Sequence, residues 1–188
     1  LESRRIKRYE GMLVEQFDHT MVVIEPDSRA LLAGVRDGAA ETLRQRLSVI
    51  PIAVDTRQLQ PVQRQLPSAR IVTLGTLHYP PNADGIRWFL REVLPLVRQQ
   101  IPEATLTIIG KNPPKDFLEA AEQNPDGVTV TGYVPDLQPY MEQSAVMVVP
   151  VRAGGGMRVR ILEAFARAMP VVTTTVGLEG IEATDGEA

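Results

Sequence analysis

The stretch from Val149 to Ala168, VPVRAGGGMRVRILEAFARA, holds residue types suited to binding a phosphorylated ligand. A run of β-branched residues leads into three consecutive glycines, Gly154 to Gly156, which are followed by Arg158 and Arg160. Glycines let the main chain wrap an anion without Cβ clashes, and a guanidinium can hold two phosphate oxygens at once. A helix expected to begin near Arg158 adds free N–H groups and the positive end of its dipole. The local sequence leaves two interpretations open: a phosphate-binding loop, and a flexible loop with two solvated arginines.

Glu163 follows in the same predicted helix, within the otherwise apolar run ILEAFA. The two oxygens of a carboxylate match the two hydroxyls of a ribose, so Glu163 is a candidate for binding a nucleoside. The alternative is a solvent-facing glutamate that the helix dipole favours near a helix start.

Two familiar nucleotide motifs fit this stretch poorly. A dinucleotide fingerprint starting at Gly154 would need Gly or Ala at its sixth position, where Val159 stands. The acidic residue expected about 20 positions later would be Glu179, which lies past a further glycine. A P-loop is excluded because no Gly-Lys-Ser/Thr follows the glycines.

The bulk composition describes an ordinary globular chain of 188 residues with 44% hydrophobic residues. The net charge of -3 gives no general attraction to nucleic acid or to anionic membranes. There is no cysteine, and His19 and His78 are far apart in the sequence, so we expect no metal site. The longest apolar run, Ala145 to Val151, is much shorter than the roughly 20 residues of a transmembrane helix.

Beyond residue 70, apolar strand patterns alternate with helical patterns. The strands are expected at 70–76, 104–110, 128–132, 145–151 and 170–175, and the helices at 82–101, 114–123, 136–143 and 158–167. Pro95 is expected to kink the first of these helices. Strands that are apolar on both sides predict an α/β fold, a Rossmann-like parallel sheet with helices on both faces.

Glycines mark the carboxyl ends of the predicted strands, where ligands bind in such sheets. These ends read LGT (74–76), IGK (109–111), TGYVPD (131–136) and VRAGGGMR (151–158). One such glycine is usually a turn, but four on one edge favour a bound ligand.

In the first part of the chain, helical and strand patterns do not alternate regularly. We expect a helix at 2–17, a strand at 20–25, a short helix ending at Leu32, a loop at 34–41 and a strand at 47–55. The segment 56–69 is polar and contains two prolines, which predicts a linker.

The segment GGGMRVRILEAFARAMPVVTTTVGLEGI resembles the nucleotide-sugar-binding segment of retaining glycosyltransferases of the GT-B fold, the group 1 family. RIVTLGTLHYPPNADGIRWFLREVLP resembles the opening strand and helix of that family's donor domain, and ATLTIIGKNP and VTVTGYVPDLQPYMEQSAVMVVP resemble its middle strands. The resemblance implies that residues 1–55 are the remnant of an N-terminal acceptor-binding domain. It also implies that residues 70–188 form a nucleotide-sugar-binding domain that is incomplete at its C-terminus.

The resemblance also implies roles for single residues. Glu163 matches the second glutamate of a Glu-x7-Glu motif, which binds the donor's ribose, and Val134 matches a position whose backbone meets the nucleobase. Gly75 and Thr76 match a loop that closes over the phosphates. The full set of expected donor-binding residues is Gly75, Thr76, Lys111, Val134, Gly154, Gly155, Gly156, Arg158, Arg160 and Glu163.

This chain departs from the family pattern at two places. The first glutamate of the motif, which contacts the donor sugar, falls on Gly155. Many relatives carry an arginine and a lysine in the first loop, where Thr76 and Asp84 stand here. We expect Arg158 and Arg160 to supply the missing positive charge from the opposite loop.

The implied reaction is transfer of a sugar from a nucleoside diphosphate sugar to an acceptor, with retention at the anomeric carbon and without a metal or other cofactor. Two alternatives are a GT-B sugar-nucleotide isomerase and a non-catalytic nucleotide-binding or regulatory module. We expect a cytoplasmic protein of polysaccharide or glycoconjugate biosynthesis, peripheral to the membrane at full length.

The expected partners are a nucleotide-sugar donor and an acceptor that the sequence does not identify; no nucleic acid is expected. Because most of an acceptor domain is missing, we expect exposed apolar surface along Tyr9, Leu13 and Phe17, self-association through it, and no transferase turnover by the chain alone.

Overall fold

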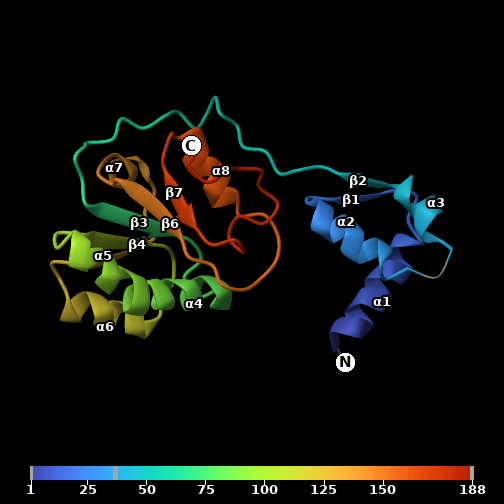
Figure 1. The fold of residues 1–188 in the computed structure, drawn as a ribbon, viewed down its shortest axis with the longest axis horizontal. Coiled ribbons are helices and arrows are strands. Elements are labelled where there is room, and N and C mark those ends of the chain that lie inside the picture. Colours follow the sequence, from blue (N-terminus) through green and yellow to red (C-terminus); the bar gives the residue numbers. More distant parts are fainter. Residues whose placement is uncertain (1, 36–37, 187–188) are drawn as a thin grey trace. The chain divides into compact units, whose positions relative to one another are not determined.

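The computed structural model describes residues 2–35 and 38–186. The chain divides into two compact units, residues 1–53 and 54–188 (Figure 1). Each unit is described by itself.

The first unit is a small α/β unit with a two-stranded parallel sheet. Its elements are α1 (Glu2–Val14), β1 (Thr20–Val22), α2 (Glu25–Leu32), α3 (Ala40–Arg44) and β2 (Leu47–Val49). The backbones of α1 and the end of α2 touch, because a Cβ on Gly11 would lie 2.2 Å from the carbonyl oxygen of Gly34. The strand expected at 47–55 ends at Val49, since Pro51 has no N–H to continue the pairing. The expected loop at 34–41 is in part outside the described residues, and α3 begins at its end.

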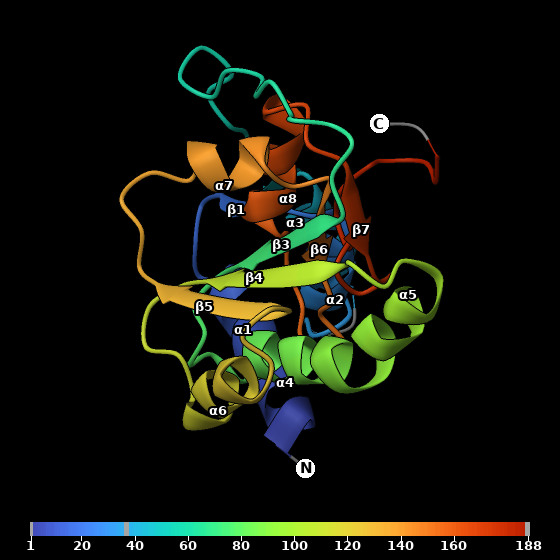
Figure 2. The same cartoon turned by 90° about the vertical axis from the view of Figure 1, so that its left-hand side faces the viewer.

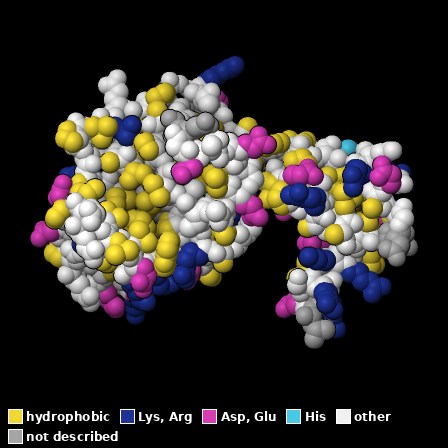
Figure 3. Space-filling model, in the orientation of Figure 1, with side chains coloured by type: hydrophobic (Ala, Val, Ile, Leu, Met, Phe, Trp, Pro, Cys, Tyr) yellow, Lys and Arg dark blue, Asp and Glu magenta, His cyan; other side chains and the backbone are white. Residues whose placement is uncertain are grey.

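Helix α1 exposes both apolar and basic side chains. Tyr9 and Phe17, the latter just beyond the helix, are 62% and 59% exposed, as expected, whereas Leu13 is half-buried. Figure 3 shows Lys and Arg side chains gathered over α1, which carries Arg4, Arg5, Lys7 and Arg8. Among the described residues, no helix is long and apolar enough to cross a membrane.

The predicted linker contains no helix or strand, but it is bound along the second unit by hydrogen bonds. The N–H of Val62 donates to the carbonyl of Arg167 (2.9 Å), and that of Gln65 donates to the carbonyl of Glu142 (2.7 Å). The guanidinium of Arg64 donates to the carbonyl of Ala145 at 3.1 Å. These long-range bonds make residues 62–65 part of the folded second unit.

The second unit is built on a five-stranded parallel sheet in the order β5-β4-β3-β6-β7. Its strands are β3 (Arg70–Leu74), β4 (Thr105–Ile109), β5 (Val128–Gly132), β6 (Val146–Val149) and β7 (Val171–Thr173). Its helices are α4 (Pro80–Trp88), η1 (Phe89–Val93), α5 (Leu94–Gln100), α6 (Lys115–Gln123), α7 (Gln138–Glu142) and α8 (Val159–Ala166).

Helices cover both faces of this sheet, which confirms the predicted fold class. Figure 2 shows α4, α5 and α6 on one face and α7 and α8 on the other. Two separate core clusters lie under these layers: Ile71 belongs to the first and its neighbour Val72 to the second. Adjacent strand residues point to opposite faces, so the two-sided apolar strands of the sequence have apolar partners on both sides.

The helix expected at 82–101 is interrupted in its middle. A π-helical turn, η1, separates α4 from α5, and Pro95 stands in the first turn of α5. Proline cannot donate the hydrogen bond that a continuous helix needs at this position, so the register changes just before it.

The strand order reverses between β3 and β6. From β3 the chain proceeds outward to β4 and β5, and it then returns to place β6 on the other side of β3. Ligands in open parallel sheets bind outside the carboxyl ends of the strands at such a reversal. The candidate site is therefore expected beside Gly75 and the loop that follows Val149.

Candidate functional site

The segments that follow β3, β4 and β5 lie together at the carboxyl edge of the sheet. The N–H of Gly75 donates to the carbonyl of Ile109 (3.0 Å), and that of Gly110 donates to the carbonyl of Gly132 (2.8 Å). A Cβ on Gly110 would lie 2.0 Å from the carbonyl oxygen of Gly75, so only glycine fits there. The glycines at these strand ends therefore let the backbones of neighbouring loops touch.

The glycine loop, residues 153–157, follows β6 on the other side of the strand reversal. Gly154 and Gly156 have φ values of 108° and 88°, in the left-handed region that favours glycine. Nη1 of Arg158 donates to the carbonyl of Gly155 (2.7 Å) and to that of Gly156. Arg158 thus folds back onto its own loop, and among the described residues its Nη2 has no hydrogen-bond partner.

Arg160 lies in the first turn of α8 and crosses to the loop that follows β3. Its Nη2 donates to Oδ1 of Asn82 at 3.0 Å, and Nδ2 of Asn82 donates to the carbonyl of Thr76 at 3.2 Å. Nη1 of Arg160 lies 3.0 Å from the place that a Cβ on Gly75 would occupy. The side chain therefore occupies the position between the two loops that flank the strand reversal.

The charge of Arg160 is buried and incompletely satisfied. Its Nε is buried and, within the described chain, has no hydrogen-bond partner. Burial lowers the pKa of Arg160 to about 10, and the positive charge of Arg158 adds to this effect. Its described hydrogen-bond partner is a neutral amide and not a carboxylate. A cation in this environment provides a strong electrostatic site for an anion.

Glu163 lies one turn further along α8 than Val159 and is half-buried. In the described part of the chain its carboxylate makes no hydrogen bond or ion pair, although Arg160 stands three positions before it on the same helix. The carboxylate therefore remains available as an acceptor.

Lys111 and Tyr133 meet at the ends of β4 and β5. Nζ of Lys111 lies 4.5 Å from the centroid of the exposed Tyr133 ring, in a cation–π contact. Val134 follows directly, half-buried against the core cluster beneath α7 and α8. These residues lie on the β4–β5 side of the sheet, and Arg160 lies near β3 and β6.

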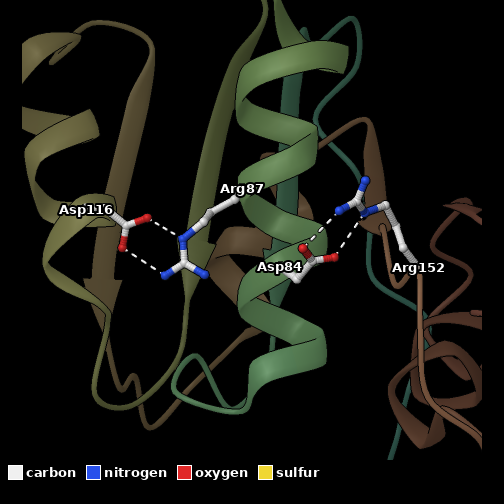
Figure 4. Close-up of polar contacts among 4 residues, drawn as sticks. All are labelled: Asp84, Arg87, Asp116 and Arg152. Carbon is white, nitrogen blue, oxygen red and sulfur yellow. Dashed lines mark hydrogen bonds and ion pairs between the residues drawn. The ribbon is translucent and has the colours of Figure 1, made fainter.

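Asp84 is held in an exposed ion pair. Nε and Nη2 of Arg152 donate to its two carboxylate oxygens at 3.0 Å and 2.9 Å, as Figure 4 shows. The hydrogen bond from Arg152 lowers the pKa of Asp84. Figure 4 also shows Arg87 extending from α4 in the other direction, toward Asp116 of α6. Asp84 thus ties α4 to the start of the glycine loop.

A family model described as Glycosyl transferases group 1 matches residues 68–188, more than half of the chain. The chain belongs to this glycosyl transferase family. The resemblance of its sequence to the group 1 glycosyltransferases is thereby confirmed.

Three known proteins illustrate what this glycosyl transferase chain is similar to. An uncharacterized 44.6 kDa protein in the cps region of Klebsiella pneumoniae is 30% identical over 128 residues, which are 65% of this chain and 33% of that protein. TarM is similar in structure, with a TM-score of 0.71 at 17% identity over 95% of this chain and 34% of TarM. The pneumococcal O-GlcNAc transferase GtfA, solved with UDP and GlcNAc, has a TM-score of 0.64 at 19% identity over 89% of this chain and 32% of GtfA.

This chain spans about a third of the length of each of these proteins. At such low sequence identities the two structural likenesses show the fold, which is the GT-B type expected from the sequence.

Two residues at the carboxyl edge are absent from the set predicted for this glycosyl transferase. Asn82 could have been found, because it lies in the first turn of the helix that follows the loop of Gly75 and Thr76. Glu179 could not, because its contact with the N–H of Gly156 joins residues 23 positions apart. Within the described residues, no group of three or more His, Asp or Glu side chains could hold a metal ion.

Proposed function

We propose that the carboxyl edge binds a nucleoside diphosphate sugar and that the complete protein transfers the sugar to an acceptor with retention at the anomeric carbon. In this proposal residues 70–188 are the donor domain and residues 1–55 belong to an acceptor-binding domain. The observation that carries the proposal is the buried guanidinium of Arg160, whose Nε is unpaired and whose described partner is an amide.

A diphosphate is the ligand that suits Arg160 best. A buried cation loses hydration, and a doubly charged anion beside it would restore the lost stabilisation through charge-assisted hydrogen bonds. Nη1 of Arg160 lies against the backbone of Gly75, which has no side chain to shield the guanidinium on that side. The free Nη2 of Arg158 is a second donor within the same region.

The roles of the other site residues are assigned from their positions along the carboxyl edge of the sheet. Glu163, with its unpaired carboxylate, is assigned to the ribose hydroxyls. Val134 and Lys111 are assigned to the nucleobase side, because they end strands on the other flank of β3. GtfA, which was solved with UDP and GlcNAc, supports a nucleotide-bearing donor for a protein of this fold.

The chemistry requires stabilisation of a leaving group. The bond between the anomeric carbon and a β-phosphate oxygen breaks, and its electron pair stays on the diphosphate. The acceptor oxygen bonds to the carbon, and the proton of its hydroxyl passes to the departing phosphate. Fixed cations beside the phosphate lower the barrier because the negative charge grows there in the transition state. The family match favours transfer over the isomerase and regulatory alternatives, and the relative in a cps region supports a role in polysaccharide synthesis.

Binding of UDP, GDP, ADP and dTDP to the wild type and to Arg160→Ala tests this proposal. We expect one diphosphate to bind preferentially and the variant to lose about 10- to 100-fold in affinity, as for a lost charged hydrogen bond. Arg91→Ala is the matched control, because Arg91 is an exposed arginine of η1. Equal affinity in wild type and Arg160→Ala would contradict the proposal, and so would the absence of binding by all four diphosphates.

A further inference from the structure

Glu179 is presented by a tightly held turn that follows β7. Thr173 donates from Oγ1 to the carbonyl of Val149 at 2.8 Å, and Thr174 donates in the same way to the carbonyl of Val151. The N–H of Gly177 returns to Oγ1 of Thr174 at 2.9 Å. A Cβ on Gly177 would lie only 2.1 Å from Oγ1 of Thr173 and 3.1 Å from the carbonyl oxygen of Val149, so the turn fits closely against the ends of β7 and β6. The main chain that carries Glu179 is therefore fixed relative to the glycine loop.

The carboxylate of Glu179 lies directly beside the glycine loop. Its Oε2 accepts a hydrogen bond of 3.1 Å from the N–H of Gly156. The same oxygen lies 3.7 Å from the place that a Cβ on Gly155 would occupy, and apart from Gly155 and its two chain neighbours no other described atom comes within 4 Å of that place. The space at Gly155 is thus open, with a carboxylate at its border.

One oxygen of this carboxylate is unused. Among the described residues, Oε1 of Glu179 accepts no hydrogen bond. A carboxylate repels a phosphate, so Glu179 does not suit the diphosphate that Arg160 attracts. It suits a neutral group with hydroxyl donors, and a sugar offers several of these.

We propose that Glu179 determines the specificity for the donor sugar by accepting a hydrogen bond from a sugar hydroxyl in the open space at Gly155. This inference rests on the proposed donor function of the carboxyl edge. It divides the site by charge: the arginines face the diphosphate and Glu179 faces the sugar attached to it. The glutamate motif that this chain resembles has its first glutamate at the position of Gly155, and here the carboxylate of Glu179 borders the same space.

The backbone allows the acid to be moved between the two positions. Gly155, unlike Gly154 and Gly156, is not in the left-handed region, and an added Cβ there would make only ordinary contact. The variant Gly155→Glu/Glu179→Gln therefore places a carboxylate at the relatives' position. Glu179→Gln alone keeps an acceptor for the N–H of Gly156 and removes the charge.

The test compares the affinities of nucleoside diphosphates and of the corresponding sugar nucleotides: UDP and UDP-glucose, GDP and GDP-mannose, ADP and ADP-glucose, dTDP and dTDP-glucose. We expect Glu179→Gln to bind the preferred sugar nucleotide about tenfold more weakly, since charged hydrogen bonds are the stronger ones. Binding of the matching diphosphate should not change. The variant Gly155→Glu/Glu179→Gln should regain the part of the affinity that depends on the sugar. The control Glu182→Gln, which changes an exposed glutamate three positions after Glu179, should bind like the wild type.

The other possible outcomes contradict the inference, and one of them also contradicts the donor function. Equal losses for diphosphate and sugar nucleotide would make Glu179 a structural support of the loop and overturn the inference. No change in either affinity would overturn it as well. In both of these cases the donor function stands as long as the wild type binds diphosphates. If the wild type binds no nucleotide, the donor function fails and the inference fails with it.

Discussion

Arg160 of α8 donates a hydrogen bond of 3.0 Å to Asn82 of α4, and this bond joins the first turns of the two helices that follow β3 and β6. The amide oxygen of Asn82 accepts this hydrogen bond, and its amide nitrogen donates one to the carbonyl of Thr76 at 3.2 Å. The arginine thus fixes the geometry of the edge, but one amide does not compensate for the burial of its charge. A buried cation that is left incompletely satisfied makes the protein less stable than it could be.

Replacing Arg160 by methionine is expected to stabilise the ligand-free protein by about 1–3 kcal/mol and to weaken diphosphate binding about 10- to 100-fold. The pKa of Arg160 is lowered to about 10, so the folded state disfavours its charged form. The resulting loss of stability is complete below about pH 10 and disappears as the pH rises toward the usual value for arginine. The advantage of Arg160→Met in urea unfolding should therefore be full at neutral pH and shrink in more alkaline solution. Arg98→Met is the control and should be destabilising, because Arg98 donates to the carbonyl of Ala104 at 2.8 Å. A less stable Arg160→Met protein at neutral pH would contradict the assignment of Arg160 as an unsatisfied cation.

Acidification should remove the contribution of the pair Arg87–Asp116, which joins α4 to α6. The hydrogen bond from Arg87 lowers the pKa of Asp116, although burial opposes this. A lowered carboxylate pKa stabilises the fold above the usual value of about 3.9, and this stability is lost as the pH falls through the folded-state value. Unfolding curves of wild type and Asp116→Asn should therefore differ at neutral pH and converge at acid pH. Glu119→Gln removes an exposed acid of the same helix and should not change the curve of stability against pH. If the stabilities of wild type and Asp116→Asn were already equal above pH 5, the result would argue against the pair.

The glycine loop offers a matched pair of substitutions. Gly156→Ala should cost about 1–2 kcal/mol, because the φ of Gly156 is 88° and side chains disfavour that region. Gly155→Ala should be nearly neutral, because its φ is not left-handed and the space around it is open. Thermal or urea unfolding of the two variants measures the difference. Equal stabilities would mean that the loop adopts another conformation.

Glu163→Gln is expected to weaken binding of the preferred nucleoside diphosphate several-fold, because a charged acceptor for the ribose hydroxyls is replaced by a neutral one. The loss should shrink for the matching dideoxyribose diphosphate, which has no hydroxyls to donate. Calorimetric titration of both ligands into both proteins gives the comparison. Equal losses for the two ligands would leave Glu163 as a helix residue without a ribose contact.

The sheet was predictable because its strands are rich in apolar residues on both sides and the first four are each followed by a helical pattern. Ile71 and Val72 illustrate the reason, since neighbouring residues enter different cores. The π-helical turn was predicted only as a kink at Pro95, since proline predicts an interruption and not the form that it takes. The end of β2 at Val49 was missed because the apolar residues up to Val54 resemble a strand, although Pro51 interrupts the pairing with β1.

The location of the candidate site was predictable from the sequence, but the contacts within it were not. Glycines and arginines between a strand and a helix indicated the edge, and the structure describes Arg158 and Arg160 there. Their different roles depend on contacts between distant segments: Asn82 lies 78 positions before Arg160 in the sequence, and Glu179 lies 23 positions after Gly156. Such pairs leave no local pattern, so only the folded chain brings them together.

A crystal structure of the protein with its preferred nucleoside diphosphate tests the central claim most directly. The account predicts that the diphosphate lies between Gly75 and the glycine loop, with its oxygens accepting hydrogen bonds from Nε of Arg160. A diphosphate bound elsewhere, for example in the cavity at the opposite edge lined by Arg70, Glu103 and Gln143, would contradict the account. The same conclusion would follow if Arg160 kept its contact with Asn82 and its Nε stayed unpaired beside the bound nucleotide.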